Sequence, residues 1–283
     1  MHIPSRRTKA IAIAIPASIV MDTPHLREKT LKMGLIGRAS AIFRVEEIIV
    51  YSDLVTDQQR DLNLVKTILS YMVTPQYLKK RIFKITPELE YAGILQPLRT
   101  PNHPLAKNSK DLRVGEFREG IVIGLSKGSS LVDIGVEKPA IVHTPLSLNK
   151  KLNVKILKVN ERVEVALASL KEINLYWGYR VSTSEQPLDE IILKRKFDLA
   201  IATSKYGKSV GNVIESLKAD WAKAGKILIA FGSPTMGLRE ILSQRKLRLE
   251  NVFQHIVNVV EEQGTETIRT EEAVLSSLAI LNF

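Results

Sequence analysis

The chain has 283 residues, of which 45% are hydrophobic and 25% charged, a globular composition long enough for one large domain or two modest ones. It contains no cysteine, which excludes disulfides, thiolate nucleophiles and cysteine-based zinc sites. Lysine and arginine number 41 against 30 acidic residues, a formal net charge of +11. This excess favours a polyanionic partner such as a nucleic acid, although a basic protein without such a partner is an equal alternative.

Neither membrane insertion nor a metal site is supported. No apolar run approaches the ~20 residues needed to cross a bilayer. Residues 1–20 superficially resemble a signal peptide, but the alternating isoleucine and alanine of residues 9–16 favour a buried strand. The five histidines show no HxxxH or HxH spacing, so we expect no bound metal.

The N-terminal segment is predicted as strand, helix, strand, helix. Residues 9–16 are a short apolar run, and residues 23–43 have a helical spacing of leucines that is interrupted near Gly34 and Gly37. Residues 45–53 are typical of a β-branched strand, and residues 56–73 of an amphipathic helix capped by Thr56 or Asp57. The leucines with helical spacing in the first segment are Leu26, Leu31 and Leu35, and the second helix places Leu62, Val65, Leu69 and Met72 on one stripe.

From about residue 81 the pattern changes to short strands. A segment rich in proline, asparagine and glycine leads into apolar runs at residues 118–125, 129–136, 139–145, 151–160 and 162–169. Turn residues separate them at intervals of roughly 8–12 residues, which predicts a small antiparallel barrel of the OB type. We therefore predict an inserted domain at 81–170, with 1–80 and 171–283 forming one α/β domain.

The α/β pattern returns at about residue 175. Strands are expected at 196–204, 226–234 and 252–260, and helices at 209–225, 237–244 and 270–281. Strands that alternate with helices predict a mainly parallel sheet. In such a sheet ligands bind beyond the carboxyl ends of the strands, which directs attention to three loops.

Each of these loops combines glycine with hydroxyl or amide groups. Thr203, Ser204 and Gly207 follow the first strand, Gly232 to Gly237 the second, and Gln263 to Thr270 the third. The sequence GSPTMG lacks the Lys–Ser/Thr of a phosphate-binding loop, no GxGxxG is present, and FGSPT is not a GxSxG nucleophile motif. We therefore predict a pocket that binds a polar, non-metal cofactor mainly through backbone groups.

Three segments resemble one known family. IAFGSPTMGLREIL, QGTETIRTEEA and, near the N-terminus, IGRASAIFRVEEIIVY resemble the SPOUT class of S-adenosylmethionine-dependent RNA methyltransferases. The similarity is greatest to its archaeal and eukaryotic branch with an inserted OB-like domain, proposed to act on ribosomal RNA uridine. GYRV (178–181) and DLAIATSKYG also suit that branch, so the resemblance covers nearly the whole chain.

The resemblance implies a C-terminal trefoil knot, in which the three loops clasp S-adenosylmethionine, and a cytoplasmic homodimer with ribosomal RNA as its partner. The cofactor-binding residues that it implies are Thr203, Ser204, Gly207, Phe231, Gly232, Ser233, Gly237, Leu238, Gln263, Gly264, Thr265, Thr267 and Ile268. Methylation of a uridine ring nitrogen would profit from a cation that stabilises the deprotonated base. Arg38 is our catalytic candidate, and Arg269 and Glu266 are second choices.

Simpler interpretations remain open at several positions. Arg38 could be a solvated helix residue or an intersubunit ion-pair partner, and Thr270 could only cap the last helix, followed by Glu271 and Glu272 in its first turn. In the irregular start of the insert, Tyr91 and Phe117 are the only clear aromatic candidates for contact with RNA bases. The alternative functions are a knotted RNA-binding or ribosome-assembly protein with little catalytic activity, and an enzyme that uses another nucleotide cofactor.

Overall fold

The computed structural model describes residues 4–126 and 128–283, which fall into two compact units. An α/β unit comprises residues 7–73, 87–97 and 179–283, and a barrel unit comprises residues 4–6, 74–86 and 98–178. The parallel sheet and the separate β-barrel expected from the sequence are both confirmed. Among the described residues, no helix is long and apolar enough to span a membrane.

The sheet of the α/β unit has six parallel strands in the order β11-β9-β10-β1-β2-β8. The strands are β1 (Ala10–Pro16), β2 (Glu47–Tyr51), β8 (Arg180–Ser184), β9 (Leu199–Ser209), β10 (Lys226–Ala230) and β11 (His255–Asn258). Neighbouring β1 and β10 are nearly continuous apolar runs with little exposure, as expected where helices cover both faces of a parallel sheet. All five strands predicted for this unit form.

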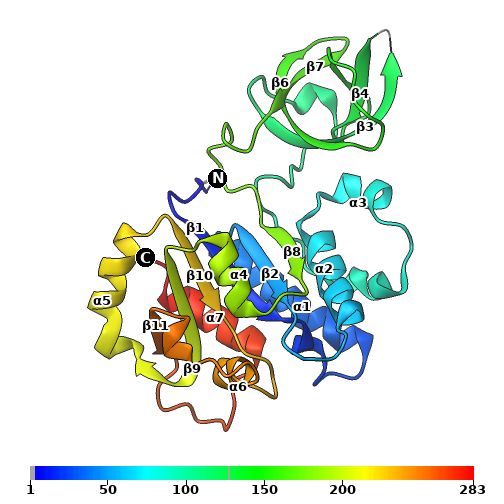
Figure 1. Ribbon diagram of the computed structural model, residues 1–283. Coiled ribbons are helices and arrows are strands. Elements are labelled where there is room, and N and C mark those ends of the chain that lie inside the picture. The colour runs from blue at the N-terminus through cyan, green and yellow to red at the C-terminus, as the bar shows by residue number, and fades with distance from the viewer. Residues whose placement is uncertain (1–3, 127) are drawn as a thin grey trace. The chain divides into compact units, whose positions relative to one another are not determined.

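Helices cover both faces of the sheet. They are α1 (Leu26–Ile42), α2 (Gln59–Val73), α4 (Leu188–Arg195), α5 (Val210–Lys223), α6 (Leu238–Ser243) and α7 (Thr270–Ile280), with short 3-10 turns η1 (Ala17–Val20), η2 (Pro87–Leu89), η3 (Ala92–Ile94) and η5 (Leu249–Asn251). Side chains of α4, α6 and η5 pack with Ala12, Ala14 and Leu228 in one core cluster. Helices α1 and α7 pack together, and Figure 1 shows them behind the sheet, with α4 in front.

The predicted interruption of α1 was wrong. The helix continues through Gly34 and Gly37 without interruption. A Cβ at Gly37 would lie 2.7 Å from the Tyr179 hydroxyl and 2.9 Å from the Met72 sulfur, so glycine here permits close packing. Of the leucines with helical spacing, Leu31 and Leu35 are 43% and 58% exposed and do not belong to the core.

The edge strand β8 and helix α4 were not predicted. The β8 sequence RVSTS has no apolar period, and its pairing with β2 is supported by a buried carboxylate. Glu47 accepts hydrogen bonds from Arg180 (2.7 Å) and Ser182 (2.7 Å), and from Arg195 (2.5 Å) of α4. The residues of this ion network are distant in sequence, so no local sequence pattern predicts it.

The barrel unit contains a closed sheet in the order β3-β4-β5-β7-β6. Its strands are β3 (Phe117–Ser126), β4 (Ser129–Asp133), β5 (Ala140–Val142), β6 (Lys151–Val159) and β7 (Val163–Ala168), and its helices are α3 (Gln76–Ile82) and η4 (Ser109–Asp111). All neighbours are antiparallel except β5 and β7. Aliphatic residues such as Val122, Val154 and Ile156 fill the interior, and the five runs predicted as strands all form.

Candidate functional site

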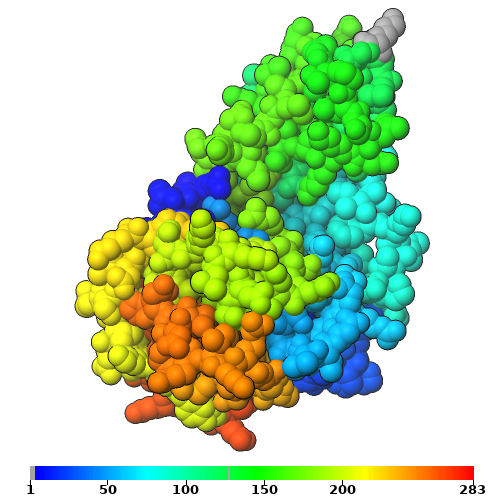
Figure 2. Space-filling view, viewed as in Figure 1, coloured from blue at the N-terminus to red at the C-terminus, as the bar shows by residue number. Residues whose placement is uncertain are grey.

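A pocket lies where the neighbouring strands β9, β10 and β11 end. The carboxyl ends of parallel strands share one edge of the sheet, so the last part of β9 meets the loops that follow β10 and β11 there. Strand β9 continues to Ser209, so Thr203 and Ser204, which were predicted to follow the strand, lie within it. The pocket has a volume of about 370 Å³. Its lining residues are Thr203–Tyr206, Phe231–Gly237, Arg239, Glu240, Val257–Val260, Gln263, Thr267, Ile268, Thr270, Ala273, Ser276 and Ser277. In the space-filling view, the chain around β11 (orange) lies at the surface of the α/β unit (Figure 2).

Most of the predicted cofactor residues lie together in this lining. Those that line the pocket are Thr203, Ser204, Phe231, Gly232, Ser233, Gly237, Gln263, Thr267 and Ile268. Gly207, Leu238, Gly264 and Thr265 do not. Leu238 is 1% exposed and belongs to the core, and the Thr265 hydroxyl donates to the Thr267 carbonyl at 3.0 Å within the loop.

Gly207 packs against the backbone of β11 and does not line the pocket. A Cβ at this position would lie 2.6 Å from the carbonyl carbon of Val257 and 2.9 Å from the amide nitrogen of Asn258. The register between β9 and β11 also shifts at Ile256 and Val257. Glycine therefore lets the two strands approach closely just below the pocket.

The second wall is a tight turn after β10. The Ser233 amide donates to the Met236 carbonyl at 2.8 Å, and the Met236 amide donates to the Ser233 hydroxyl at 2.9 Å. A Cβ at Gly232 would lie 2.9 Å from both the Gly237 Cα and the Met236 carbonyl oxygen. Only a glycine fits inside this turn, so the wall that it presents is mainly backbone.

A buried tyrosine holds the start of the same wall. The Tyr51 hydroxyl donates to the Phe231 carbonyl at 2.8 Å, and the Phe231 amide donates to the Ala14 carbonyl at 2.9 Å. Burial, together with the negative charge of Asp53, raises the pKa of Tyr51 well above its usual range. The hydroxyl therefore keeps its proton and remains a donor.

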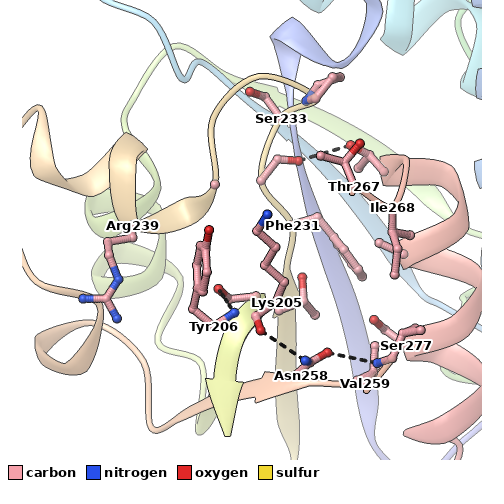
Figure 3. Close-up of a pocket in the computed structure, with 18 of the residues that line it drawn as sticks. Lys205, Tyr206, Phe231, Ser233, Arg239, Asn258, Val259, Thr267, Ile268 and Ser277 are labelled. Atoms are coloured by element: carbon pink, nitrogen blue, oxygen red, sulfur yellow. Dashed lines mark hydrogen bonds between the residues drawn. The ribbon is translucent and has the colours of Figure 1, made fainter. Parts of the chain in front are cut away.

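The first wall of the pocket is formed by Thr203–Tyr206 of β9. Hydrogen bonds connect this wall to β10 and β11. The Thr203 hydroxyl donates to the Ala230 carbonyl at 2.9 Å. The Asn258 side chain donates to the Lys205 carbonyl at 3.1 Å and accepts from the Val260 amide at 3.1 Å (Figure 3). The last part of β9 is thus fixed to the end of β10 and, through Asn258, to the segment that follows β11.

Helix α7 forms a fourth side of the pocket, which was not predicted from the sequence. Thr270, Ala273 and Ser277 are spaced i, i+3 and i+7, which places these small side chains on one helical face. This spacing of small residues was the sequence signal that could have predicted the fourth side of the pocket. Thr270 was expected as the N-cap, but Arg269 holds that position, and its amide donates to Glu272 at 2.9 Å. The hydroxyl of the buried Thr270 donates instead to the Gly232 carbonyl at 3.3 Å.

Ser277 is the notable polar group on this side. It is fully buried, and its hydroxyl has no hydrogen-bond partner among the described residues. An unsatisfied buried hydroxyl is costly in free energy. A pocket ligand could supply the missing partner.

The charged lining residues are Lys205, Arg239 and Glu240. Lys205 was not predicted; its ammonium lies 3.4 Å from the Glu266 carbonyl oxygen and 5.1 Å from the Tyr206 ring centroid. Arg239 donates to Glu250 at 3.4 Å. Figure 3 shows Lys205 among the labelled side chains and Arg239 at their margin, beyond Tyr206. Lys205 is therefore the more central cation.

The predicted catalytic arginine does not line the pocket. Arg38 is half-buried on α1 and donates to the Pro97 carbonyl at 3.1 Å. The second choices, Arg269 and Glu266, are exposed. The backbone carbonyl of Glu266, which lies 3.4 Å from the Lys205 ammonium, also accepts a hydrogen bond from the Gln263 side chain at 3.0 Å.

Residues 10–281 match the family described as "Putative RNA methyltransferase". The chain belongs to this family. The match covers both ends of the sheet, all four sides of the pocket and the whole barrel.

Similarity to individual proteins extends over nearly the full chain. A "28S rRNA (uridine-N(3))-methyltransferase" of Drosophila melanogaster is 30% identical across 96% of this chain and 61% of its own length. The human protein of the same name is 30% identical across 97% of this chain and 78% of its own length. An uncharacterised protein of Halobacterium salinarum is 29% identical and covered over 98% of its length.

Membership of an RNA methyltransferase family implies a methyl donor and an RNA substrate. Among the residues 4–126 and 128–283, no group of three or more histidine, aspartate and glutamate side chains is arranged to hold a metal ion. The described pocket, with its backbone walls and hydroxyl groups, is the candidate site for the donor.

Proposed function

We propose that the chain transfers a methyl group from S-adenosylmethionine to ring nitrogen N3 of a uridine in large-subunit ribosomal RNA. The observation that carries the proposal is the pocket at the carboxyl edge of the sheet, walled by the last part of β9 and by the loops after β10 and β11. Family membership supports the reaction class. The names of the fly and human relatives support the base and the RNA.

The lining residues fit S-adenosylmethionine. A volume of about 370 Å³ lies within the usual range for small-molecule sites. The backbone of Gly232 and Ser233 can form hydrogen bonds with polar groups of the cofactor, and Val257 and Ile268 can form apolar contacts with it. The Ser277 hydroxyl, which has no partner among the described residues, can form a further hydrogen bond. The bound cofactor supplies an activated methyl group, so the protein mainly needs to align the acceptor.

Deprotonated uridine calls for a cation beside the base. We assign this task to Lys205 from within the pocket, and to Arg38 reaching the pocket from a second copy of the chain. Lysine and arginine side chains can stabilise negative charge on the ring. In this scheme Gly207 and Leu238 support the walls, and the predicted residues that line the pocket hold the cofactor.

The α1 surface supports a homodimer. Leu31, Leu35, Arg38 and Ile42 are spaced i, i+4, i+7 and i+11, so they share one face of α1. The three apolar side chains are 43%, 58% and 55% exposed. The adjacent helix α7 exposes Leu275 and buries Val274 and Leu278. A helix that is apolar on both faces is normally buried, and a second copy, which would bring Arg38 into the interface, is the occupant we propose.

Mixing two inactive variants tests this arrangement. Arg38→Ala and Lys205→Met should each reduce methyl transfer strongly, and an exchanged mixture should recover activity, because a mixed dimer contains one complete site. Recovery would not occur if Arg38 acted on the pocket of its own chain. Leu35→Glu should convert dimers to monomers in light scattering, whereas Leu193→Glu on the exposed side of α4 should not.

We further propose that residues 199–281 form the SPOUT trefoil knot. Support comes from β9, which lies between β10 and β11, and from α7, whose first residue returns to Gly232. Pulling single molecules by their ends should release less contour length than the residue count requires, because a tightened knot retains chain. Full extension would exclude the knot.

The enzyme and the RNA-binding alternative differ in one product. Calorimetric titration should detect S-adenosylmethionine binding to the pure protein, and mass spectrometry should detect N3-methyluridine in ribosomal RNA after incubation. Binding of cofactor and RNA without any new methylated nucleoside would favour the assembly protein. Absence of cofactor binding at high protein concentration would refute the cofactor assignment.

A further inference from the structure

The outer face of β3 and β6 in the barrel unit carries two aromatic rings in a fixed arrangement. The rings of Phe117 and Trp177 meet edge to face, with centroids 6.5 Å apart and an interplanar angle of 80°. The Trp177 indole donates to the Asn153 side chain at 2.9 Å. Both aromatic residues are half-buried, so part of each ring stays accessible.

Backbone hydrogen bonds hold the segment that carries Trp177. The Tyr176 amide donates to the Pro4 carbonyl at 3.0 Å, and the Arg6 amide donates to the Asn174 carbonyl at 2.9 Å. Ser5 and Leu175 form an antiparallel bridge between them. The indole is therefore presented from a supported segment, which lowers the entropy cost of binding a ligand against it.

Positive charge and open space lie beside the rings. Lys155 pairs with Phe117 across the strands, and its ammonium lies 5.7 Å from the Phe117 ring centroid. On β7, the residues opposite Lys155 and Asn153 are Ala166 and Ala168, whose short side chains leave the surface low.

Two acidic residues bear on this face: exposed Glu172, whose charge interacts with that of Lys155, and Glu119, which is neutralised. Glu119 is 5% exposed, pairs with Lys151 at 2.7 Å and accepts from Asn102 at 2.9 Å. It therefore adds little repulsion to an anionic ligand that approaches Lys155.

The opposite wall of the barrel lacks these features. In OB-type barrels the second and third strands commonly form the binding face, which here would be β4 and β5. Their partly exposed side chains include Leu131, Asp133 and Ile141 but no aromatic residue. Asp133 pairs with Arg81 at 2.6 Å, and His143 lies 3.4 Å from Glu164.

We propose that the barrel binds single-stranded RNA on its β3–β6 face, with a base stacked at Trp177 and Phe117 and a phosphate at Lys155. We call this face, made of Phe117, Asn153, Lys155 and Trp177, the aromatic platform. Bases stack on aromatic side chains irrespective of sequence, while cations contact the backbone. The inference rests on the proposed function only in that RNA is the substrate.

Tryptophan fluorescence tests the platform directly. The chain has two tryptophans, and Trp221 is buried against Phe283. Trp221→Phe therefore leaves Trp177 as the only fluorophore of its kind. Titration with an oligouridylate of about 12 nucleotides, a length within the usual range for such barrels, should quench its emission saturably.

Substitutions measure the contribution to affinity. Trp177→Ala should weaken oligouridylate binding, followed by fluorescence anisotropy, roughly 5- to 150-fold, and Trp177→Phe should restore part of the loss. Lys155→Ala should lower the slope of log affinity against log salt by about one. The matched control is Lys138→Ala, an exposed lysine in the loop between β4 and β5, which should leave that slope nearly unchanged.

Two results would overturn the platform. One is unquenched Trp177 emission at saturating oligouridylate, and the other is a larger loss of affinity from Leu131→Ala on β4 than from Trp177→Ala. Neither result bears on methyl transfer, which nucleoside mass spectrometry measures independently. Conversely, a chain without methyltransferase activity would still quench Trp177 if the platform binds RNA.

Discussion

Substitution of Gly207 distinguishes a ligand-binding glycine from a structural one. The sequence predicted Gly207 as part of the cofactor wall, whereas the structure puts it against the backbone of β11. The three nearest atoms to an added Cβ would be backbone atoms of Ile256, Val257 and Asn258, at 2.6 to 2.9 Å. Backbone atoms cannot rotate away, so Gly207→Ala must separate β9 from β11.

The required movement sets the expected magnitude. Ordinary contact begins at 3.4 Å, so an atom at 2.6 Å must retreat by about 0.8 Å. Overpacking of this kind costs typically ~1–3 kcal/mol, and the rigidity of a paired strand favours the upper half of that range. In a domain of this size each kcal/mol lowers the melting temperature by roughly 2–4 °C, which gives an expected fall of roughly 4–12 °C.

Differential scanning calorimetry measures this change, and Gly264→Ala is the matched control. A Cβ at Gly264 would meet no atom within 4 Å, so its effect on the free energy of unfolding should stay below about 0.5 kcal/mol. The structural reasoning is refuted if Gly207→Ala leaves the melting temperature unchanged. Lost affinity for S-adenosylmethionine in such a stable variant would then restore the ligand-contact role.

Three further substitutions probe the α/β unit. Burial tends to raise the pKa of Glu47, but hydrogen bonds from Arg180 and Ser182 and the charge of Arg195 lower it overall. A lowered pKa gives stability that is present above the unfolded-state value and lost as the pH falls through the folded-state value. Glu47→Gln should therefore cost about 1–3 kcal/mol at neutral pH and flatten the acid limb of urea-unfolding stability against pH; an unchanged limb would contradict the ion network. Ser277→Ala should raise the melting temperature of the free protein slightly, because it removes a buried hydroxyl without a partner among the described residues. It should weaken S-adenosylmethionine binding by roughly 2- to 13-fold, and equal affinity in calorimetry would exclude the hydroxyl as a ligand contact. Lys32→Met should cost about 3–5 kcal/mol in urea unfolding, because it leaves the buried Glu271 without its cation; a smaller loss would mean that water reaches this carboxylate.

The strands were predictable because their burial is local in sequence. Continuous apolar runs such as AIAIAIP and KILIA are typical of strands inside a sheet covered on both faces. The β-barrel was predicted from the alternation of apolar and polar residues and from the regular spacing of turn residues. The break in α1 was predicted from the low helix propensity of glycine. Tertiary packing of Gly37 against Tyr179 and Met72 overrides that propensity.

The site was predictable where it follows from strand direction. Parallel strands end at one edge, so the three segments were expected to meet, and residues of all three line one pocket. The first segment was predicted as a loop, but it lies within β9, which continues to Ser209. Lys205, which lies within β9, was missed because an exposed lysine is typical of solvated surface. Ser277 was missed because its importance depends on the face that α7 presents to the pocket, and this face is fixed by contacts distant in sequence.

The first turn of α7 connects the pocket to the α1 surface. Thr270 donates to Gly232 in the pocket wall, and the next residue, Glu271, lies 3.6 Å from the ammonium of Lys32 on α1, which also pairs with Asp22 at 2.7 Å. Lys32 and Glu271 are 5% and 7% exposed, so their attraction is weakly screened. A ligand that contacts the Gly232 turn is therefore connected to α1 through Thr270 and Glu271. If the α1 face with Leu35 and Arg38 is the dimer surface, cofactor binding and dimerisation stabilise each other through this turn, because linkage between two binding events is reciprocal.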